Sequence, residues 1–189
     1  MIKEKLILAS KSPRRAEILR AAGWSFEVIA ADIDETRRDG EQAVDYVQRL
    51  ANEKAEVVAA NVSSGLILAA DTTVVVDDHV LGQPVDDEDA RRMLQLLSGR
   101  WHEVLTGVAL LRVAEVETRV VDHECTRVRF AELAREEIDW YIATGETRGK
   151  AGAYGIQGRA ALFIDQIQGD YFNIVGLPVR LVYEMVKKV

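Results

Sequence analysis

The sequence has almost no cysteine and little proline, and these shortages exclude several classes of protein. Its single cysteine, Cys125, rules out an internal disulfide and a zinc site built from cysteines. Only three prolines occur in 189 residues, and 48% of the chain is hydrophobic, which is not the composition of a disordered protein. No apolar run approaches the roughly 20 residues of a membrane helix, and the first run is too short for a signal peptide. We therefore expect a cytoplasmic protein with no membrane partner.

Positive charge is also in short supply. The chain has 31 acidic residues against 24 lysines and arginines, a net charge of -7. Because affinity for nucleic acid polymers comes mostly from neutralising phosphates, we do not expect such a polymer as a partner. The phosphate-binding pattern GxxxxGK is absent as well. The length suits one filled core, so we expect a single domain over residues 1–189.

Strand-like and helix-like segments alternate along the chain. The apolar patterns predict strands over 5–9, 25–30, 66–76, 104–113, 118–130 and 161–167, a return strand at 80–81, and helices over 13–22, 41–60, 86–97, 136–143 and 177–188. Ser12 is the expected N-cap of the first helix, with Pro13 at its first position and Gly23 just past its end. Late in the chain, two long strands follow one another directly. This order predicts an α/β fold with a mixed sheet, flanking helices and two lobes around a cleft.

Two arginines stand where the first helix should be apolar. Arg14 precedes Ile18 by four residues, and Arg15 precedes Leu19 by four, so both share the apolar face. One interpretation is that their side chains reach back to solvent. The other is an anion site at the helix N-terminus, to which Ser10 adds a hydroxyl.

Lys54 and Asp71 repeat the anomaly in other segments. Lys54 falls inside the apolar stripe of its helix, four residues after Leu50 and four before Val58. It either reaches solvent or meets a phosphate. Asp71 interrupts the uncharged run LILAADTTVVV. A buried carboxylate must be protonated, paired or bound to a cation, so Asp71 either caps a strand end or acts as a metal ligand or general base.

An acidic loop follows the second predicted strand. Asp32, Asp34 and Glu35 are the acidic members of ADIDET. Such loops are commonly just solvated. Combined with Asp71, they offer the hard oxygen ligands that Mg²⁺ or Mn²⁺ prefers.

A glycine-rich segment, GETRGKAGAYGIQG, precedes the last predicted strand. It is either a flexible connection or a loop whose backbone approaches a nucleotide base closely. Gln157 within it carries a donor and an acceptor that suit a pyrimidine edge. His102 precedes a strand, and we expect it to be structural.

Seven segments, in order, resemble the Maf family of nucleoside triphosphate pyrophosphatases. They are LILASKSPRRAEILRAAG, DIDET, RLANEKA, AADTTVVVDDHVLGQP, MLQLLSGRWHEVLTGVAL, GKAGAYGIQG and GDYFNIVGLP. The resemblance implies hydrolysis of a nucleoside triphosphate at its α–β phosphate bond, a divalent cation (Mg²⁺ or Mn²⁺) as cofactor, and commonly a homodimer. It also implies a fold similar to that of the inosine triphosphate pyrophosphatases.

The resemblance also assigns roles by motif. It implies phosphate binding by Ser10, Arg14 and Arg15, the acidic-loop glutamate at Glu35, the helix lysine at Lys54, the catalytic and metal-binding aspartate at Asp71, and base selection by Arg14, Thr72 and Gln157. Threonine after the aspartate, together with YGIQG, resembles the branch that acts on dTTP and UTP and extends to modified pyrimidine nucleotides.

One position departs from the family pattern. Gln83 in LGQP stands where a lysine is more common in the family, and an amide cannot supply that lysine's charge near the phosphates. Either Arg15 and Lys54 suffice, or turnover is slower. Two alternatives therefore stay open: a nucleotide-binding regulator of cell division with little turnover, and a pyrophosphatase of the type that acts on 7-methyl-GTP.

Overall fold

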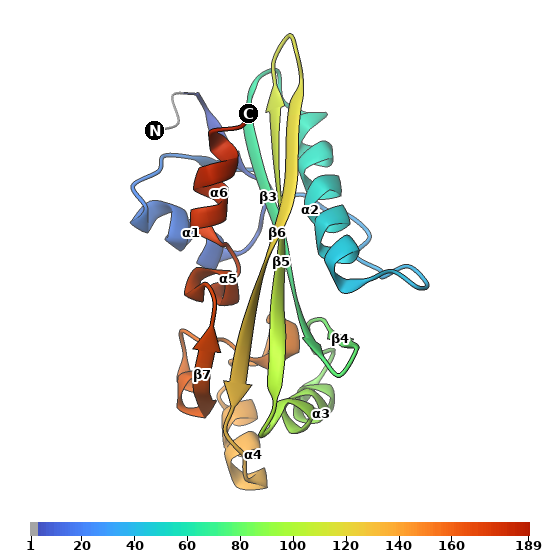
Figure 1. Ribbon diagram of the computed structural model, residues 1–189, viewed down its shortest axis with the longest axis vertical. Coiled ribbons are helices and arrows are strands. Elements are labelled where there is room, and N and C mark those ends of the chain that lie inside the picture. The colour runs from blue at the N-terminus through green and yellow to red at the C-terminus, as the bar shows by residue number, and fades with distance from the viewer. Residues whose placement is uncertain (1–3) are drawn as a thin grey trace. The chain divides into compact units, whose positions relative to one another are not determined.

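The computed structural model describes residues 4–189, which form helices and strands in alternation (Figure 1). The strands are β1 Leu6–Leu8, β2 Glu27–Val28, β3 Gly65–Val76, β4 His79–Leu81, β5 Trp101–Val113, β6 Thr118–Phe130 and β7 Ile164–Gln168. The α-helices are α1 Pro13–Ala21, α2 Ala43–Ala59, α3 Asp87–Leu97, α4 Arg135–Ala143, α5 Tyr171–Val175 and α6 Val179–Val186, and the 3₁₀ helices are η1 Ala151–Ala153 and η2 Arg159–Phe163.

Within residues 4–189 the strands form one seven-stranded mixed sheet in the order β2-β1-β3-β5-β6-β7, with β4 added to β3. β1 pairs in parallel with β2 and β3, with Ile7 opposite Glu27 and Ile67. By contrast, β4 runs antiparallel to β3, and β7 runs antiparallel to β6. The mixed α/β fold expected from the sequence is thereby confirmed.

Two compact units make up the chain. Unit 1 comprises 1–71, 106–124 and 176–189, of which the structure describes residues from 4 onward, and unit 2 comprises 72–105 and 125–175. β3, β5 and β6 contribute residues to both units.

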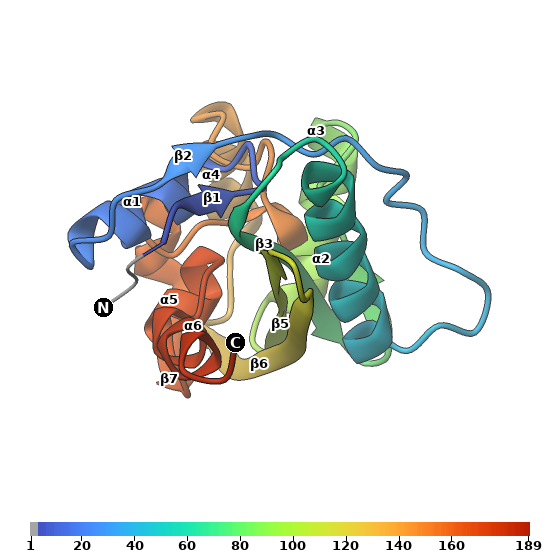
Figure 2. The same cartoon turned by 90° about the horizontal axis from the view of Figure 1, so that it is seen from above.

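Unit 1 is a small sheet with helices on both sides. Helix α2 lies on one side of the strands, and α1 and α6 lie on the other (Figures 1 and 2). Alternate residues along β1, β3 and β5 form one apolar cluster with α2: Ile7, Ala9, Ala51, Ala55, Val58, Ile67, Ala69, Ala109 and Leu111. Leu66 and Leu68 occupy the intervening positions and are also fully buried, as expected for strands that are covered on both faces.

Unit 2 has its own core, built from β3–β6, α3, α4 and the glycine-rich segment. Phe130, Tyr141 and Tyr154 are its largest aromatic members. Phe130 lies edge-to-face against Tyr154, with the ring centroids 4.8 Å apart. This aromatic packing gives the glycine-rich segment a fixed support.

The structure corrects the sequence interpretation at the C-terminal end. Residues 161–163 belong to the 3₁₀ helix η2, and the strand that we expected from Ala161 begins only at Ile164. Helix α5 was missed. Ser12 is the N-cap of α1, as expected, but its side chain makes no capping hydrogen bond. Among the described residues, no helix has both the length and the apolar character required to cross a membrane.

Candidate active site

Lys54 holds two carboxylates together in unit 1. Its Nζ lies 2.6 Å from Asp71 Oδ1 and 2.6 Å from Glu35 Oε1. The Lys54 and Asp71 side chains are only 11% and 12% exposed, whereas Glu35 is 51% exposed. The lysine therefore does not reach out to solvent, and the buried aspartate is paired.

Helix α2 and strand β3 fix this pair. On α2 the neighbours of Lys54 in the stripe, Leu50, Ala51 and Val58, are at most 1% exposed, so the helix cannot turn the lysine outward without exposing its apolar face. Asp71 projects from a strand whose preceding residues, 66–70, are fully buried. Both charged groups are thus held by regular elements rather than by loops.

Arg15 joins Ser10 at the start of α1. Its Nη1 donates to Ser10 Oγ at 3.1 Å, and its Nε donates to the carbonyl of Gly176 at 2.7 Å. Burial lowers the pKa of Arg15, and attraction to Asp71 is the largest opposing effect. An arginine keeps its charge in proteins nonetheless. Arg14, in the same first turn, is partly buried, and burial lowers its pKa too.

The predicted phosphate and metal residues therefore share one unit. Arg15 lies within the electrostatic range of Asp71 and Glu35, and those two carboxylates contact Lys54. Asp32 and Asp34 do not join them. Asp32 pairs with Lys11 at 3.5 Å, and Asp34 accepts a hydrogen bond from the Thr36 amide at 2.9 Å.

The donor set fits a divalent cation that is shared with a ligand. Among the described residues, no group of three or more histidine, cysteine or acidic side chains is arranged to hold a metal. Glu35 and Asp71 nevertheless both contact the Lys54 ammonium, so their two carboxylates meet at one point. Mg²⁺ is typically bound by one or two carboxylates, with phosphate oxygens and water completing its shell. Two carboxylates that meet at Lys54 fit that requirement.

Sequence reasoning did not find three residues that contact the loop of Glu35 or one another: Glu41, Tyr46 and Arg49. Tyr46 Oη donates to the Glu35 carbonyl at 2.9 Å, and Arg49 Nη2 donates to the Thr36 carbonyl at 3.1 Å. Glu41 accepts from Arg49 through both carboxylate oxygens. This bond to Arg49 lowers the pKa of Glu41 to about 2, and burial raises the pKa of Tyr46 to about 12. The only sequence signal was Arg49 itself, the first residue of RLANEKA.

Of the predicted base-selecting residues, Arg14 belongs to unit 1, whereas Thr72 and Gln157 belong to unit 2, as does Gln83. Thr72 is partly buried in β3, whereas Gln83 and Gln157 are exposed in loops. The Gly152 amide donates to the Gly82 carbonyl at 3.1 Å, so the segment of Gln83 lies beside the glycine-rich loop. Gly152 has φ +65°, and a Cβ there would approach Val74 to 3.0 Å. This loop is therefore a shaped element rather than a flexible connection.

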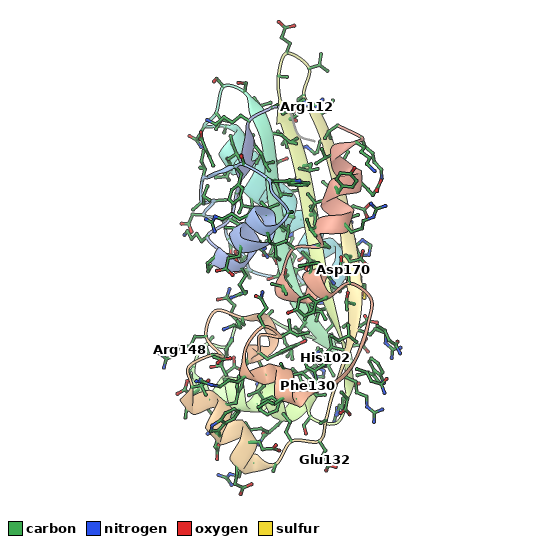
Figure 3. The ribbon with its side chains drawn as sticks, turned by 90° about the vertical axis from the view of Figure 1, so that its left-hand side faces the viewer. His102, Arg112, Phe130, Glu132, Arg148 and Asp170 are labelled. Carbon is green, nitrogen blue, oxygen red and sulfur yellow. The ribbon has the colours of Figure 1, made fainter. Side chains whose placement is uncertain are left out.

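Buried polar residues support the same loop. Tyr154 Oη lies 2.8 Å from His102 Nε2, and the Gly155 amide donates to Tyr141 Oη at 3.3 Å. His102 packs edge-to-face on Phe130, with 5.1 Å between ring centroids, and Figure 3 labels both side chains in unit 2. Burial lowers the pKa of His102 to about 4, so it is neutral at pH 7.

The chain is similar to a protein-family model, to curated relatives and to a solved structure. A protein-family model described as Maf-like protein matches residues 5–189. A protein of Symbiobacterium thermophilum named dTTP/UTP pyrophosphatase is 52% identical over 96% of this chain and 92% of its own. One of Koribacter versatilis with the same name is 50% identical over 97% of this chain and 93% of its own. The solved structure of the Staphylococcus aureus Ham1 protein is 15% identical, with a TM-score of 0.48 over 68% of this chain and 72% of that one.

Proposed function

The chain belongs to the Maf-like protein family, and on that premise we propose that it hydrolyses dTTP and UTP to the nucleoside monophosphate and pyrophosphate. The substrate is supported by the relatives named dTTP/UTP pyrophosphatase, which are about 50% identical over nearly the whole chain. One observation carries the chemistry. The buried Asp71 of β3 is paired with Lys54 of α2, and Glu35 contacts the same lysine.

The triphosphate binds at the N-terminus of α1. The positive end of the helix dipole favours an anion there, and Arg14 and Arg15 add charge-assisted donors. Ser10, 7% exposed, is already hydrogen-bonded to Arg15 and to the Ser12 amide, so its hydroxyl is fixed before substrate arrives. Lys54 supplies a further positive charge to the phosphate oxygens.

Glu35 and Asp71 would hold the divalent cation, Mg²⁺ or Mn²⁺. When bound, it would offset the negative charge that grows on the phosphate oxygens in the transition state. Asp71 also faces the attacking water, which it orients or deprotonates. Water adds across the α–β phosphoanhydride, and pyrophosphate departs with the bridging oxygen.

By the family resemblance, Thr72 and Gln157 select the base, and Gln83 stands where a phosphate-side lysine is more common. The support for Gln157 is that its loop is held by His102, Tyr141 and Gly82 through hydrogen bonds. A fixed loop can reject a wrong base, because any buried polar group left unpaired costs free energy. We also propose that the chain forms a homodimer, as the family resemblance implies, and that it is cytoplasmic, as its composition favours.

Replacing Asp71 tests the chemistry. Asp71→Asn keeps the side-chain shape but removes the carboxylate charge, so pyrophosphate release from dTTP should fall by about a thousandfold. The matched control is Asp45→Asn, at an exposed position in the first turn of α2. Circular dichroism melting should show that both variants are folded. Retained release by Asp71→Asn would remove this residue from the chemistry.

A substrate panel tests the function itself. Pyrophosphate release should be fastest with dTTP and UTP when these are compared with dCTP, modified pyrimidine nucleotides, dATP and 7-methyl-GTP. Nucleotide binding without product would favour a regulator of cell division, for which Gln83 is the suggestive residue. Preference for 7-methyl-GTP would place the chain in the other enzymatic branch.

A further inference from the structure

Glu35 is a loop residue, unlike its two partners. It lies between β2 and α2, where residues 29–42 form no helix or strand. Lys54 and Asp71, by contrast, stand on regular elements. Catalytic groups need to be held within a fraction of an ångström, and loops on their own do this poorly. Some other contact must therefore fix Glu35.

Two side chains of α2 donate hydrogen bonds to the backbone at Glu35 and the residue after it. Tyr46 Oη donates to the Glu35 carbonyl at 2.9 Å, and Arg49 Nη2 donates to the next carbonyl, that of Thr36, at 3.1 Å. Tyr46 and Arg49 are three residues apart on the helix and so share a face. The guanidinium of Arg49 lies over the Tyr46 ring, 5.7 Å from its centroid. Both carbonyls are thus tied to the helix that carries Lys54.

Arg49 is itself held in place. Glu41 accepts from Arg49 Nε at 2.5 Å and from Nη2 at 2.9 Å. The Arg49 side chain is only 14% exposed and that of Glu41 only 9%. Such a two-pronged arginine–carboxylate pair fixes orientation as well as distance. Glu53 adds a contact to Nη1 at 3.2 Å, and the Arg38 amide donates to Glu41 at 3.0 Å. One guanidinium thus ties residues 36 and 41 of the loop to α2.

We propose that Tyr46 and Arg49 are positioning residues, which act through the main chain of residues 35 and 36 to hold the Glu35 carboxylate beside Lys54 and Asp71. They touch neither substrate nor cation. This inference rests on the proposed function, because it assigns their purpose to the same site.

Removing one hydroxyl tests the proposal with little disturbance. Tyr46→Phe deletes the donor to the Glu35 carbonyl and keeps the ring beneath Arg49. The rate constant kcat for dTTP should fall by about tenfold, the usual effect of losing a supporting contact. Amide hydrogen exchange of residues 32–42 should become faster without substrate or metal. The matched control is Tyr183→Phe, on α6 in the same unit, which should change neither quantity.

A double-mutant cycle separates positioning from a general structural effect. In a Glu35→Ala background there is no carboxylate left to position, so Tyr46→Phe should cause no further loss of kcat. An equal loss in both backgrounds would overturn the proposal. So would unchanged kcat and unchanged loop exchange in Tyr46→Phe.

Arg49→Lys gives an independent variant. Lysine keeps the charge but cannot bridge Glu41 and Thr36 at once, so exchange of residues 32–42 should also accelerate. Its control is Arg119→Lys, at an exposed pair with Glu56. If the wild-type protein releases no pyrophosphate, the proposed function fails. Faster exchange in both variants would still show that Tyr46 and Arg49 hold the loop in place. If exchange is unchanged while the wild type turns over dTTP normally, the positioning role is rejected and the proposed function stands.

Discussion

At the scale of single residues, Lys54 occupies the place where a cation belongs. Its ammonium lies 2.6 Å from each of two carboxylates, in a site with little exposure on the Asp71 side. An ammonium can be replaced there by a metal only if it moves aside or shares the carboxylates. Lys54 should therefore contribute to the stability of the fold as well as to catalysis.

Lys54→Met should reveal this double role. Without metal, the variant should lose about 3 kcal/mol of unfolding free energy, because breaking a buried ion pair leaves its carboxylate uncompensated. Mn²⁺ should restore much of that loss by taking the place of the ammonium, and it should stabilise the wild type much less. Urea unfolding with and without Mn²⁺ measures both. Lys187→Met, at a half-exposed pair with Glu184, is the control and should cost about 0.5 kcal/mol.

Equal stabilisation of the Lys54→Met variant and the wild type by Mn²⁺ would contradict this expectation. Glu35 and Asp71 would then not be a cation site in the free protein. The role of Asp71 in orienting water would be unaffected by that result.

His102 makes stability depend on pH. It is 2% exposed, and burial lowers its pKa to about 4 from the usual 6.5. Between these values the unfolded chain binds a proton that the folded chain does not, so unfolding free energy falls as pH drops from about 6.5 to about 4. The loss should reach roughly 3 kcal/mol, since each pKa unit is worth about 1.4 kcal/mol.

A His102→Gln variant isolates this contribution. Glutamine cannot take up the proton, so the difference between wild type and variant should shrink with falling pH. Urea unfolding at about pH 7.5 and about pH 4.5 gives that difference directly. Parallel curves for the two proteins would show that His102 is protonated equally in both states.

At the scale of elements, the approach of β5 to α2 depends on a single glycine. A Cβ on Gly107 would lie 2.2 Å from the Val47 carbonyl oxygen and 2.4 Å from its carbon. Both atoms are backbone and cannot rotate away. Glycine inside a strand commonly marks such a close approach of two chains.

Gly107→Ala should therefore push α2 away from the sheet. We expect a loss of about 2 kcal/mol in unfolding free energy, as for other overpacked sites. Pyrophosphate release should also fall, because α2 carries Lys54, Tyr46 and Arg49. Gly82→Ala is the control for stability, since a Cβ there meets nothing within 4 Å. A Gly107→Ala protein as stable as the control would show that α2 gives way without cost.

Elements with local signals were predictable from sequence, and those formed by distant contacts were not. Proline at the start and Gly23 after the end delimit α1 almost to the residue, and the strand at Thr118–Phe130 matches its prediction. Helix α5 has only five residues and no period to detect. Asn173 donates to the Val104 carbonyl at 2.9 Å and to Thr126 Oγ1 at 3.1 Å, both far away along the chain. Those contacts exist only in the folded chain.

The site shows the same division. Lys54 and Asp71 could be found because a charge within an apolar pattern is conspicuous. Tyr46 and Arg49 could not, because a half-buried polar residue on a helix looks like ordinary solvated surface. Their purpose depends on the carbonyls of a loop, and the pattern of side chains says nothing about where a loop's carbonyls point.

At the scale of the whole molecule, net charge and local charge oppose each other. The chain carries -7 overall, yet Arg14, Arg15 and Lys54 belong to one unit with the start of α1. A local cluster acts within a Debye length, about 8 Å at physiological salt, whereas the net charge acts on anything larger. A single triphosphate fits inside the cluster's range. A nucleic acid strand does not.

The protein should therefore bind dTTP and ignore a polymer of the same nucleotide. Fluorescence anisotropy with a labelled oligothymidylate of about 20 nucleotides should show no saturable binding between about 50 mM and about 200 mM salt, while a labelled dTTP analogue binds. Both probes present the same base, so the comparison isolates the phosphate groups: one compact triphosphate against a chain of phosphodiesters. Tight oligomer binding that weakens steeply with salt would mean that an extended basic track overrides the net charge, and the small-nucleotide site would then be one end of a polymer groove.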